Sequence, residues 1–294
     1  MNIALSSYRL VNQVTSLIAP SWTAKKLLLK FLTPRHSKIK AWEVKAEEKG
    51  TRFNLSDDIS AIRWLPNDAS DLNGTKGSKS KPSKKVLLVH GWESRATQMY
   101  GFVPQLLKQG YEVIALDMPA HGSSSGSTTN PYEFSQTVLL AESILGSFEV
   151  IIGHSMGAGA ANIAITQGLA SQKLVLISGP SSIENVLRRF ARFLGLNNNA
   201  VNFFIKHAGD LIGFKAEDID LITVQKRTEI PTLFIHDRMD YEVPIIESER
   251  MLPVFTNSEF LVTEGLGHRQ ILKSELVLNK IEEFIIGDKL PVSN

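Results

Sequence analysis

The sequence contains no cysteine among its 294 residues. It therefore forms no disulfide, offers no thiolate to a metal and has no cysteine nucleophile, so any nucleophile must be another residue type. A chain without cysteine suits a reducing compartment, and we expect a cytoplasmic protein.

The sequence also lacks long apolar runs and a large net charge. No stretch approaches the roughly 18 to 20 consecutive apolar residues that a membrane-spanning helix needs, so no transmembrane segment is expected. The 32 basic and 30 acidic residues leave a formal net charge of +2, which gives no whole-chain electrostatic reason to bind nucleic acid. With 43% hydrophobic residues, the chain can nevertheless bury a large core.

Acidic residues are absent from positions 1–42, whose charges are all positive: Arg9, Lys25, Lys26, Lys30, Arg35, Lys38 and Lys40. Polar residues break the apolar run after Arg9, so we do not expect a secretory signal peptide. Residues 22–32 read as an amphipathic basic helix, which could touch a membrane surface or simply lie across the catalytic domain. We treat residues 1–40 as an N-terminal basic helical segment.

The rest of the chain changes pattern once. Between residues 42 and 65 the short alternating runs AWEVKA, TRFNL and ISAIRWL predict antiparallel strands, whereas β-branched and leucine-rich runs separated by helical stretches follow from residue 85. Such runs predict a mostly parallel sheet covered by helices on both faces, an α/β fold. We expect strands at 85–90, 111–117, 148–154, 173–179, 231–237 and 259–265. Helices are expected at 96–109, 131–145, 156–170, 245–251 and 270–286.

Two stretches depart from this alternation. Residues 67–85 are rich in glycine, serine and lysine, and they read as an exposed loop whose lysines could also bind an acidic partner. Residues 180–229 are too long for a simple crossover and show mixed helical patterns, which predicts a small helical cap inserted before the penultimate parallel strands. The catalytic domain would then comprise residues 41–179 and 230–294.

The predicted cap is rich in aromatic and basic side chains. Its phenylalanines could line an acyl pocket or form the cap's own small core. Its arginines could attract a carboxylate-bearing substrate or form a solvated helix face. The residues concerned are Phe190, Phe193, Phe203, Phe204, Phe214, Arg188, Arg189 and Arg192.

The strongest motif is Gly153-His154-Ser155-Met156-Gly157, which joins a predicted apolar strand to a helix of small residues. A serine on so sharp a turn has a strained backbone, and the two glycines remove side chains that would collide with the neighbouring strand and helix. The pattern predicts a nucleophile elbow that presents the Ser155 hydroxyl above the sheet.

With this motif and those that accompany it in order, the chain resembles the α/β-hydrolase superfamily from about residue 40 to 286. Within it, the chain is similar to serine esterases and lipases and to the serine aminopeptidase branch. The run HGW, ending at Trp92, looks like the oxyanion loop of the family, which implies that the backbone N–H groups of Trp92 and Met156 hold the oxyanion. The run DMPAHGSS is similar to the DxxGHGxS loop, which implies structural roles for Asp117 and His121.

The resemblance also implies an acid and a base. The run IHDRMDYEVP resembles the strand-end HGxxDxxVP pattern and points to Asp240 as the acid, although Asp237 offers a second carboxylate in the same loop. The run GLGHR looks like the GxGH loop that presents the base, His268. His268 would take the proton of Ser155 during attack, and Asp240 would orient the imidazole and stabilise its cation.

These residues imply a serine hydrolase that works through an acyl-enzyme and needs no metal or cofactor. We expect a carboxylesterase acting on small to medium acyl esters. A monoacylglycerol lipase, a thioesterase, a carbon–carbon bond hydrolase or an aminopeptidase would use the same triad. A lipase recruited to a membrane surface by residues 1–40 is a further alternative. A non-catalytic α/β-hydrolase that binds a ligand or a protein would show a damaged triad, whereas the pattern here is intact. The sequence does not set the oligomeric state.

Overall fold

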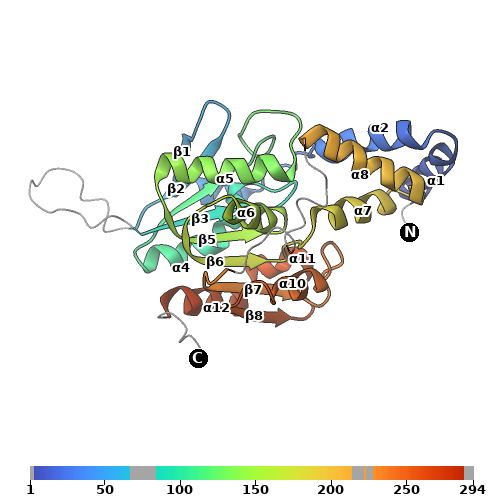
Figure 1. Ribbon diagram of the computed structural model, residues 1–294. Helices are drawn as coiled ribbons and strands as arrows, with labels where there is room; N and C mark the ends of the chain where they lie inside the picture. Colours follow the sequence, from blue (N-terminus) through green and yellow to red (C-terminus); the bar gives the residue numbers. More distant parts are fainter. Residues whose placement is uncertain (1–2, 67–83, 214–221, 223–227, 288–294) are drawn as a thin grey trace, which may run out of the picture.

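The structure, a computed structural model, describes residues 3–66, 84–213, 222 and 228–287. Its centre is one sheet with the strand order β1-β2-β4-β3-β5-β6-β7-β8 (Figure 1). The strands are β1 (Thr51–Asn54), β2 (Ser60–Trp64), β3 (Lys85–Val89), β4 (Glu112–Leu116), β5 (Phe148–His154), β6 (Ser171–Ile177), β7 (Thr232–Asp237) and β8 (Ser258–Thr263). The β1–β2 and β2–β4 pairs are antiparallel and the others are parallel. The predicted fold class is confirmed.

Helices cover both faces of the sheet because the central strands are apolar on both sides. In β3, Val86 and Leu88 pack into one buried cluster while Leu87 and Val89 pack into the other. The first cluster lies under η2 (Ala96–Phe102), α4 (Val103–Lys108), η4 (Ile271–Lys273) and α12 (Glu275–Ile286). The second lies under α5 (Pro131–Leu145), α6 (Met156–Thr166) and α10 (Ile246–Met251).

Local signals set the ends of α5 at the residues predicted. Its N-cap, Asn130, accepts a hydrogen bond from the backbone N–H of Glu133 at 3.0 Å, and Pro131 occupies the first turn. Gly146, with φ of 78°, ends the helix. These capping residues therefore determine where the helix begins and ends.

The expected strand at AWEVKA is wrong, because this run forms the helix α3 (Ala41–Glu48). The side chain of Glu43 accepts the backbone N–H of Lys40 at 2.8 Å and starts the helix. Glu43 and Ala46, three positions apart, form its buried face, and the carbonyl of Ala46 accepts the indole N–H of Trp64. So short a run fits either period, and packing against the sheet decided it. The strands expected in the other two runs are present as β1 and β2.

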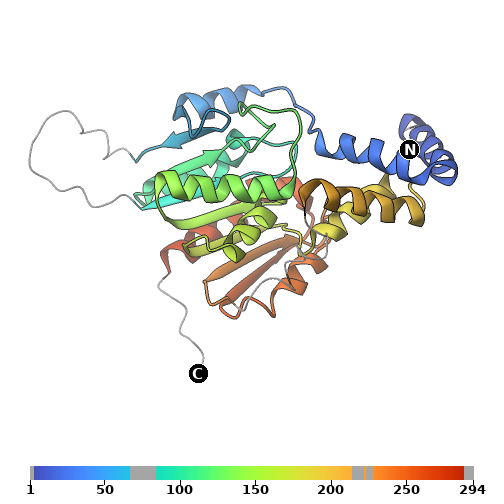
Figure 2. The same ribbon diagram turned by 45° about the horizontal axis from the view of Figure 1, so that its top comes forward.

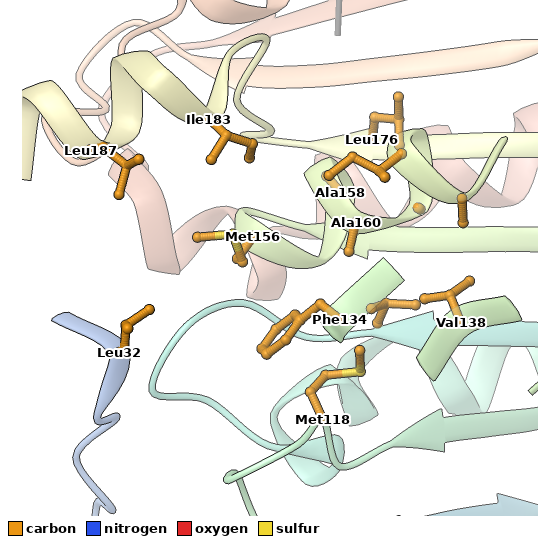
Figure 3. Close-up of a cluster of buried hydrophobic side chains, with 14 of the residues drawn as sticks. Leu32, Met118, Phe134, Val138, Met156, Ala158, Ala160, Leu176, Ile183 and Leu187 are labelled. Carbon is orange, nitrogen blue, oxygen red and sulfur yellow. The ribbon is translucent and has the colours of Figure 1, made fainter. Parts of the chain in front are cut away.

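Four helices form a lobe at one end of the molecule: α1 (Ile3–Ile18), α2 (Pro20–Leu32), α7 (Ile183–Phe193) and α8 (Asn198–Ile212) (Figures 1 and 2). The helix expected at 22–32 is α2, which packs against α7 and α8. Figure 3 shows part of the buried cluster that continues into the sheet domain, where Leu32 joins Phe134 and Met156.

Part of the predicted cap and loop lies outside the described residues, namely positions 67–83, 214–221 and 223–227. The division of the chain into domain units therefore stays a prediction. None of the helices within the described ranges is long and apolar enough to span a bilayer.

Candidate active site

Ser155 stands at the turn between β5 and α6. Its φ of 54° and ψ of −120° place it in a region that L-residues rarely adopt. The turn closes because glycines flank it. A Cβ on Gly153 would lie 2.6 Å from the Cα of Ala158, and one on Gly157 would lie 2.2 Å from the carbonyl oxygen of Val89. The predicted motif therefore has the geometry of a nucleophile elbow.

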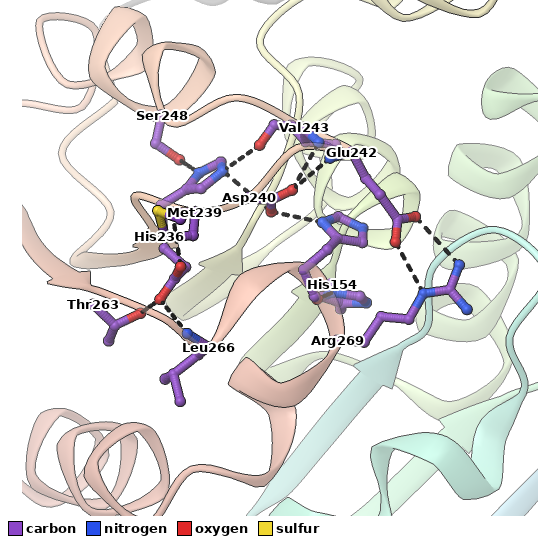
Figure 4. Close-up of polar contacts among 12 residues, drawn as sticks. His154, His236, Met239, Asp240, Glu242, Val243, Ser248, Thr263, Leu266 and Arg269 are labelled. Carbon is purple, nitrogen blue, oxygen red and sulfur yellow. Dashed lines mark hydrogen bonds and ion pairs between the residues drawn. The ribbon is translucent and has the colours of Figure 1, made fainter. Parts of the chain in front are cut away.

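His268 and Asp240 come together across two loops. His268 lies in the first turn of α11 (Gly267–Gln270), and its Nδ1 lies 2.7 Å from Oδ2 of Asp240 (Figure 4). The other carboxylate oxygen accepts the backbone N–H groups of Glu242 and Val243 at 3.0 and 2.9 Å. Both side chains are buried. The carboxylate is thus held in one orientation toward the imidazole.

The charge of Asp240 is set by its partners. Burial alone would raise its pKa, but hydrogen bonds from His236 and His268 and from the Val243 N–H together hold the pKa of the carboxyl below its ordinary value. His236 itself is fixed, because its two ring nitrogens lie 2.7 Å from Oγ of Ser248 and 2.8 Å from the Val243 carbonyl. Asp240 is therefore an anion at neutral pH.

Asp237, the second carboxylate of this loop, has different contacts. It accepts hydrogen bonds from the hydroxyl of Thr263 at 2.7 Å and from the backbone N–H groups of Met239 and Leu266 at 2.8 and 2.9 Å (Figure 4). These contacts tie the end of β7 to the loop after β8. The structure brings Asp240 to the imidazole of His268 and uses Asp237 to hold the two loops together.

The two predicted oxyanion donors lie on neighbouring loops. Met156 is the first residue of α6, so its N–H has no acceptor within the helix. Within the described ranges, the backbone N–H groups of Trp92 and Met156 donate no hydrogen bond. A Cβ on Gly91 would lie 2.9 Å from the Cβ of Ser155, so the loop after β3 runs directly against the elbow. Two donors are thus available next to the serine.

The side chain of Trp92 is held by aromatic rings, a feature that sequence reasoning missed. Its ring stacks on Phe31 of α2, with centroids 5.5 Å apart and an interplanar angle of 7°. The Trp92 ring also stacks on Phe134, with centroids 6.0 Å apart, and makes a T-shaped contact with His121, with centroids 5.1 Å apart. Phe31 also packs on Phe190 of α7 at 4.7 Å. The lobe therefore supports the loop that carries Trp92, one of the two predicted oxyanion donors.

Asp117 and His121 hold loops, as the resemblance implies. Asp117 accepts the backbone N–H of Ala96 at 2.8 Å and pairs with the guanidinium of Arg52 at 2.7 Å. Nε2 of His121 accepts the backbone N–H of Glu93 at 2.9 Å. Both side chains thus connect the loop after β4 to the loop after β3 by hydrogen bonds.

Two further histidines are buried close to the site. Nε2 of His90 accepts the backbone N–H of Met118 at 3.0 Å, and Nε2–H of His154 donates to the carbonyl of His268 at 2.9 Å. Burial, with a nearby histidine in each case, lowers the pKa of both rings to about 3. Both are neutral at physiological pH, so they act as hydrogen-bonding supports.

A cleft of about 600 Å³ lies over Ser155 and His268. Its walls come from the segment between α2 and α3, the loop after β3 and the start of α11. Two ion pairs stand on these walls, Arg35 with Glu93 and Arg269 with Glu242. The lining residues are Arg35, His36, Ser37, Lys40, Trp42, Gly91, Trp92, Glu93, Ser94, Gln98, His154, Ser155, Glu242, His268, Arg269, Leu272 and Lys273.

The described cap residues do not line this cleft. Phe204 is fully buried within the lobe, Phe190 packs on the rings described above, and Phe193 is 53% exposed. Arg188 pairs with Glu184 in its own helix, and Arg189 pairs with Glu247. Phe190 and Phe204 therefore belong to the packing of the lobe, and Arg188 and Arg189 are held in ion pairs. Phe214 lies outside the described residues. No group of three or more His, Asp or Glu side chains in the described ranges is placed to hold a metal ion.

Comparisons with known proteins agree with this geometry. The sequence model of the alpha/beta hydrolase family matches residues 86–268. A serine hydrolase-like protein of Dictyostelium discoideum is 32% identical over 122 residues, which are 40% of this chain and 30% of that protein. The uncharacterized hydrolase YugF of Bacillus subtilis is 37% identical over 81 residues, 26% of this chain and 29% of that protein. The match therefore spans 30% or less of either curated relative.

Solved structures share the fold. The esterase Pf2001 of Pyrococcus furiosus has a TM-score of 0.57 at 23% identity, covering 86% of this chain and 95% of its own. Est1E of Butyrivibrio proteoclasticus, in a structure with ferulic acid bound, has a TM-score of 0.61 at 16% identity, covering 80% and 98%. Because the family model spans more than half of the chain, and the sheet, elbow and loops follow the same plan, this protein belongs to the alpha/beta hydrolase family.

Proposed function

We propose that this hydrolase cleaves carboxylic esters of small to medium acyl groups, with Ser155 as its nucleophile. The contact that carries the proposal is the 2.7 Å hydrogen bond between His268 and Asp240, because His268 lines the same cleft as Ser155. A serine, a histidine and an ionised carboxylate in this relation are the parts that acyl transfer needs.

In the proposed reaction, each of these groups has one role. Nε2 of His268 takes the proton of Ser155 as its Oγ attacks the ester carbonyl carbon. Asp240, bonded to Nδ1 of the same ring, holds the tautomer and stabilises the imidazolium. The backbone N–H groups of Trp92 and Met156 bind the oxyanion, His268 returns the proton to the leaving alcohol, and water then releases the acid by the same steps.

The size of the cleft supports small to medium substrates. At about 600 Å³ it lies within the range of roughly 300 to 1,000 Å³ that is typical of small-molecule sites. The fold is shared with the esterase Pf2001, and this analogy, which is one of fold alone, also supports an ester as the substrate.

Hydrolysis of p-nitrophenyl esters from acetate to palmitate tests this proposal. We expect turnover of the short and medium esters, and a loss on the order of 10⁴-fold or more in Ser155→Ala. Ser143→Ala, which changes an exposed serine of α5, is the matched control and should keep the activity of the wild type. Equal rates for Ser155→Ala and the wild type, or no turnover of any ester by either, would overturn the proposal.

A further inference from the structure

Helix α1 presents its apolar side chains to solvent. Five of them are between 49% and 80% exposed: Leu10, Val11, Val14, Leu17 and Ile18. At about 100° per residue, these positions fall within roughly one third of the helix circumference. They form one continuous apolar face, which we call the α1 face.

The opposite side of α1 is polar and buried, which is the reverse of an ordinary surface helix. Asn12 and Ser16 are 6% and 1% exposed. The side-chain amide of Asn12 donates to the carbonyl of Leu194 at 2.9 Å, and that of Asn197 donates to the carbonyl of Ser16 at 2.9 Å. These hydrogen bonds to the loop between α7 and α8 fix the rotation of α1, so its apolar face is held outward.

Helix α2 adds exposed apolar and basic side chains to the same hairpin. Trp22 and Leu29 are 59% and 60% exposed. Lys25, Lys26 and Lys30 of the same helix are also exposed, and Nζ of Lys26 lies 5.1 Å from the ring of Trp22. An apolar face beside lysines and a tryptophan is the composition of a helix that lies in a membrane interface.

The charge of the chain is divided unevenly. Residues 1–42 hold seven basic residues and no acidic one, which leaves 25 basic against 30 acidic residues in the rest. In both views α1 lies at the tip of the lobe, far from the sheet (Figures 1 and 2). Four of the seven basic residues, Arg9, Lys25, Lys26 and Lys30, belong to the hairpin of α1 and α2, which holds no acidic residue. The hairpin is therefore both positive and apolar, which fits an anionic surface.

We propose that the hairpin of α1 and α2 docks on an anionic lipid bilayer. The α1 face and Trp22 enter the boundary between headgroups and acyl chains, while Lys25, Lys26 and Lys30 meet lipid phosphates and carboxylates. A two-fold contact between copies of this chain would bring these same lysines of both copies together, so the charge disfavours self-association as the occupant. The proposal is independent of the ester chemistry.

Vesicle sedimentation with the full-length protein tests the docking. The vesicles are phosphatidylcholine alone and phosphatidylcholine with about one third phosphatidylserine. We expect binding to the anionic vesicles that weakens with added salt, and binding at least about tenfold weaker for Leu17→Gln/Ile18→Gln. Both positions are 75% or more exposed, so thermal unfolding of this variant should match the wild type. The control is Ile144→Gln/Leu276→Gln, which changes apolar residues of α5 and α12 that are 51% and 59% exposed, and it should bind like the wild type.

Three results would overturn the proposal. The first is a wild-type protein that stays in the supernatant with the anionic vesicles. The second is equal binding by Leu17→Gln/Ile18→Gln and the wild type. The third, read by analytical ultracentrifugation, is a wild-type dimer that becomes monomeric in Leu17→Gln/Ile18→Gln. Because no readout uses ester turnover, failure here is distinct from failure of the proposed hydrolase activity.

Discussion

The carboxyl edge of the sheet and the helical lobe differ in how their backbones are built. Each loop that follows β3, β4, β5 and β6 contains a non-glycine residue with positive φ: Glu93, Ala120, Ser155 and Ser178. The described residues of α1, α2, α7 and α8 contain none. Strained backbone costs of order 1 to 3 kcal/mol per residue and persists only where surrounding contacts enforce it. The edge therefore concentrates strain and buried polar groups, while the lobe is regular helix held by side-chain packing.

The two regions meet at one aromatic contact, the stack of Phe31 on Trp92. Through it, a helix from the first part of the chain supports the loop that carries a proposed oxyanion donor. Variants at the carboxyl edge of the sheet, in the lobe and at this contact can therefore test how the two regions differ.

The largest expected effect separates the two carboxylates of the edge. Asp240→Asn should lower kcat on the order of 10⁴-fold, because the amide favours the wrong tautomer of His268. Asp237→Asn is the matched control. It weakens contacts to Thr263 and Leu266, so it should lower the free energy of unfolding by about 1 to 3 kcal/mol and keep most of the kcat. Steady-state kinetics and urea unfolding measure both quantities. A larger loss of kcat in Asp237→Asn than in Asp240→Asn would reverse the assignment.

A second prediction concerns acid. His90 and His154 have pKa values of about 3 in the folded protein, against about 6.5 when unfolded, so the unfolded chain binds more protons between these values. Their stabilising contribution is therefore complete above pH 6.5 and is lost as the pH falls toward 3. From pH 7 to 5 we expect the free energy of unfolding to drop by roughly 2 kcal/mol for each histidine.

Urea unfolding at pH 7, 6 and 5 measures this slope. His154→Gln keeps an N–H donor for the His268 carbonyl but does not titrate, so it should reduce the drop by roughly 2 kcal/mol. An unchanged slope in His154→Gln would mean that this ring is not a source of the acid sensitivity of the edge.

The smallest expected effect tests the contact between the regions. Phe31→Leu keeps an apolar side chain but removes the stack on Trp92, and aromatic pairs contribute about 0.5 to 1.5 kcal/mol beyond area burial. If the stack positions the oxyanion donor, kcat should fall between about twofold and tenfold with little change in KM. Phe193→Leu, the same change at a 53% exposed site in α7, is the control. A KM effect without a kcat effect would show that Phe31 shapes the cleft and does not position the donor.

The sequence predicted the edge better than the lobe, for a physical reason. The elbow, the loop after β3 and the GLGHR loop each carry a motif of residues adjacent in the chain, so these motifs could be recognised from the sequence. The choice between Asp237 and Asp240 needed the position of His268, which is set by the pairing of β7 with β8. The stack of Phe31 on Trp92 joins residues 61 positions apart and has no local signal. The exposure of the α1 face could not be predicted either, because the sequence shows that a helix is amphipathic but not which of its faces is turned toward solvent.

The four strained loops also bear on the order in which the molecule assembles. The backbone N–H groups of Ser155 and Ser178 donate to the carbonyls of Ile177 and Ile235, so these two turns are held only after the neighbouring strands have paired. The site is accordingly completed late, when the sheet already exists. Partial unfolding will reach it early, so hydrolytic activity would be a stricter gauge of the native state than any measurement of helix or strand content.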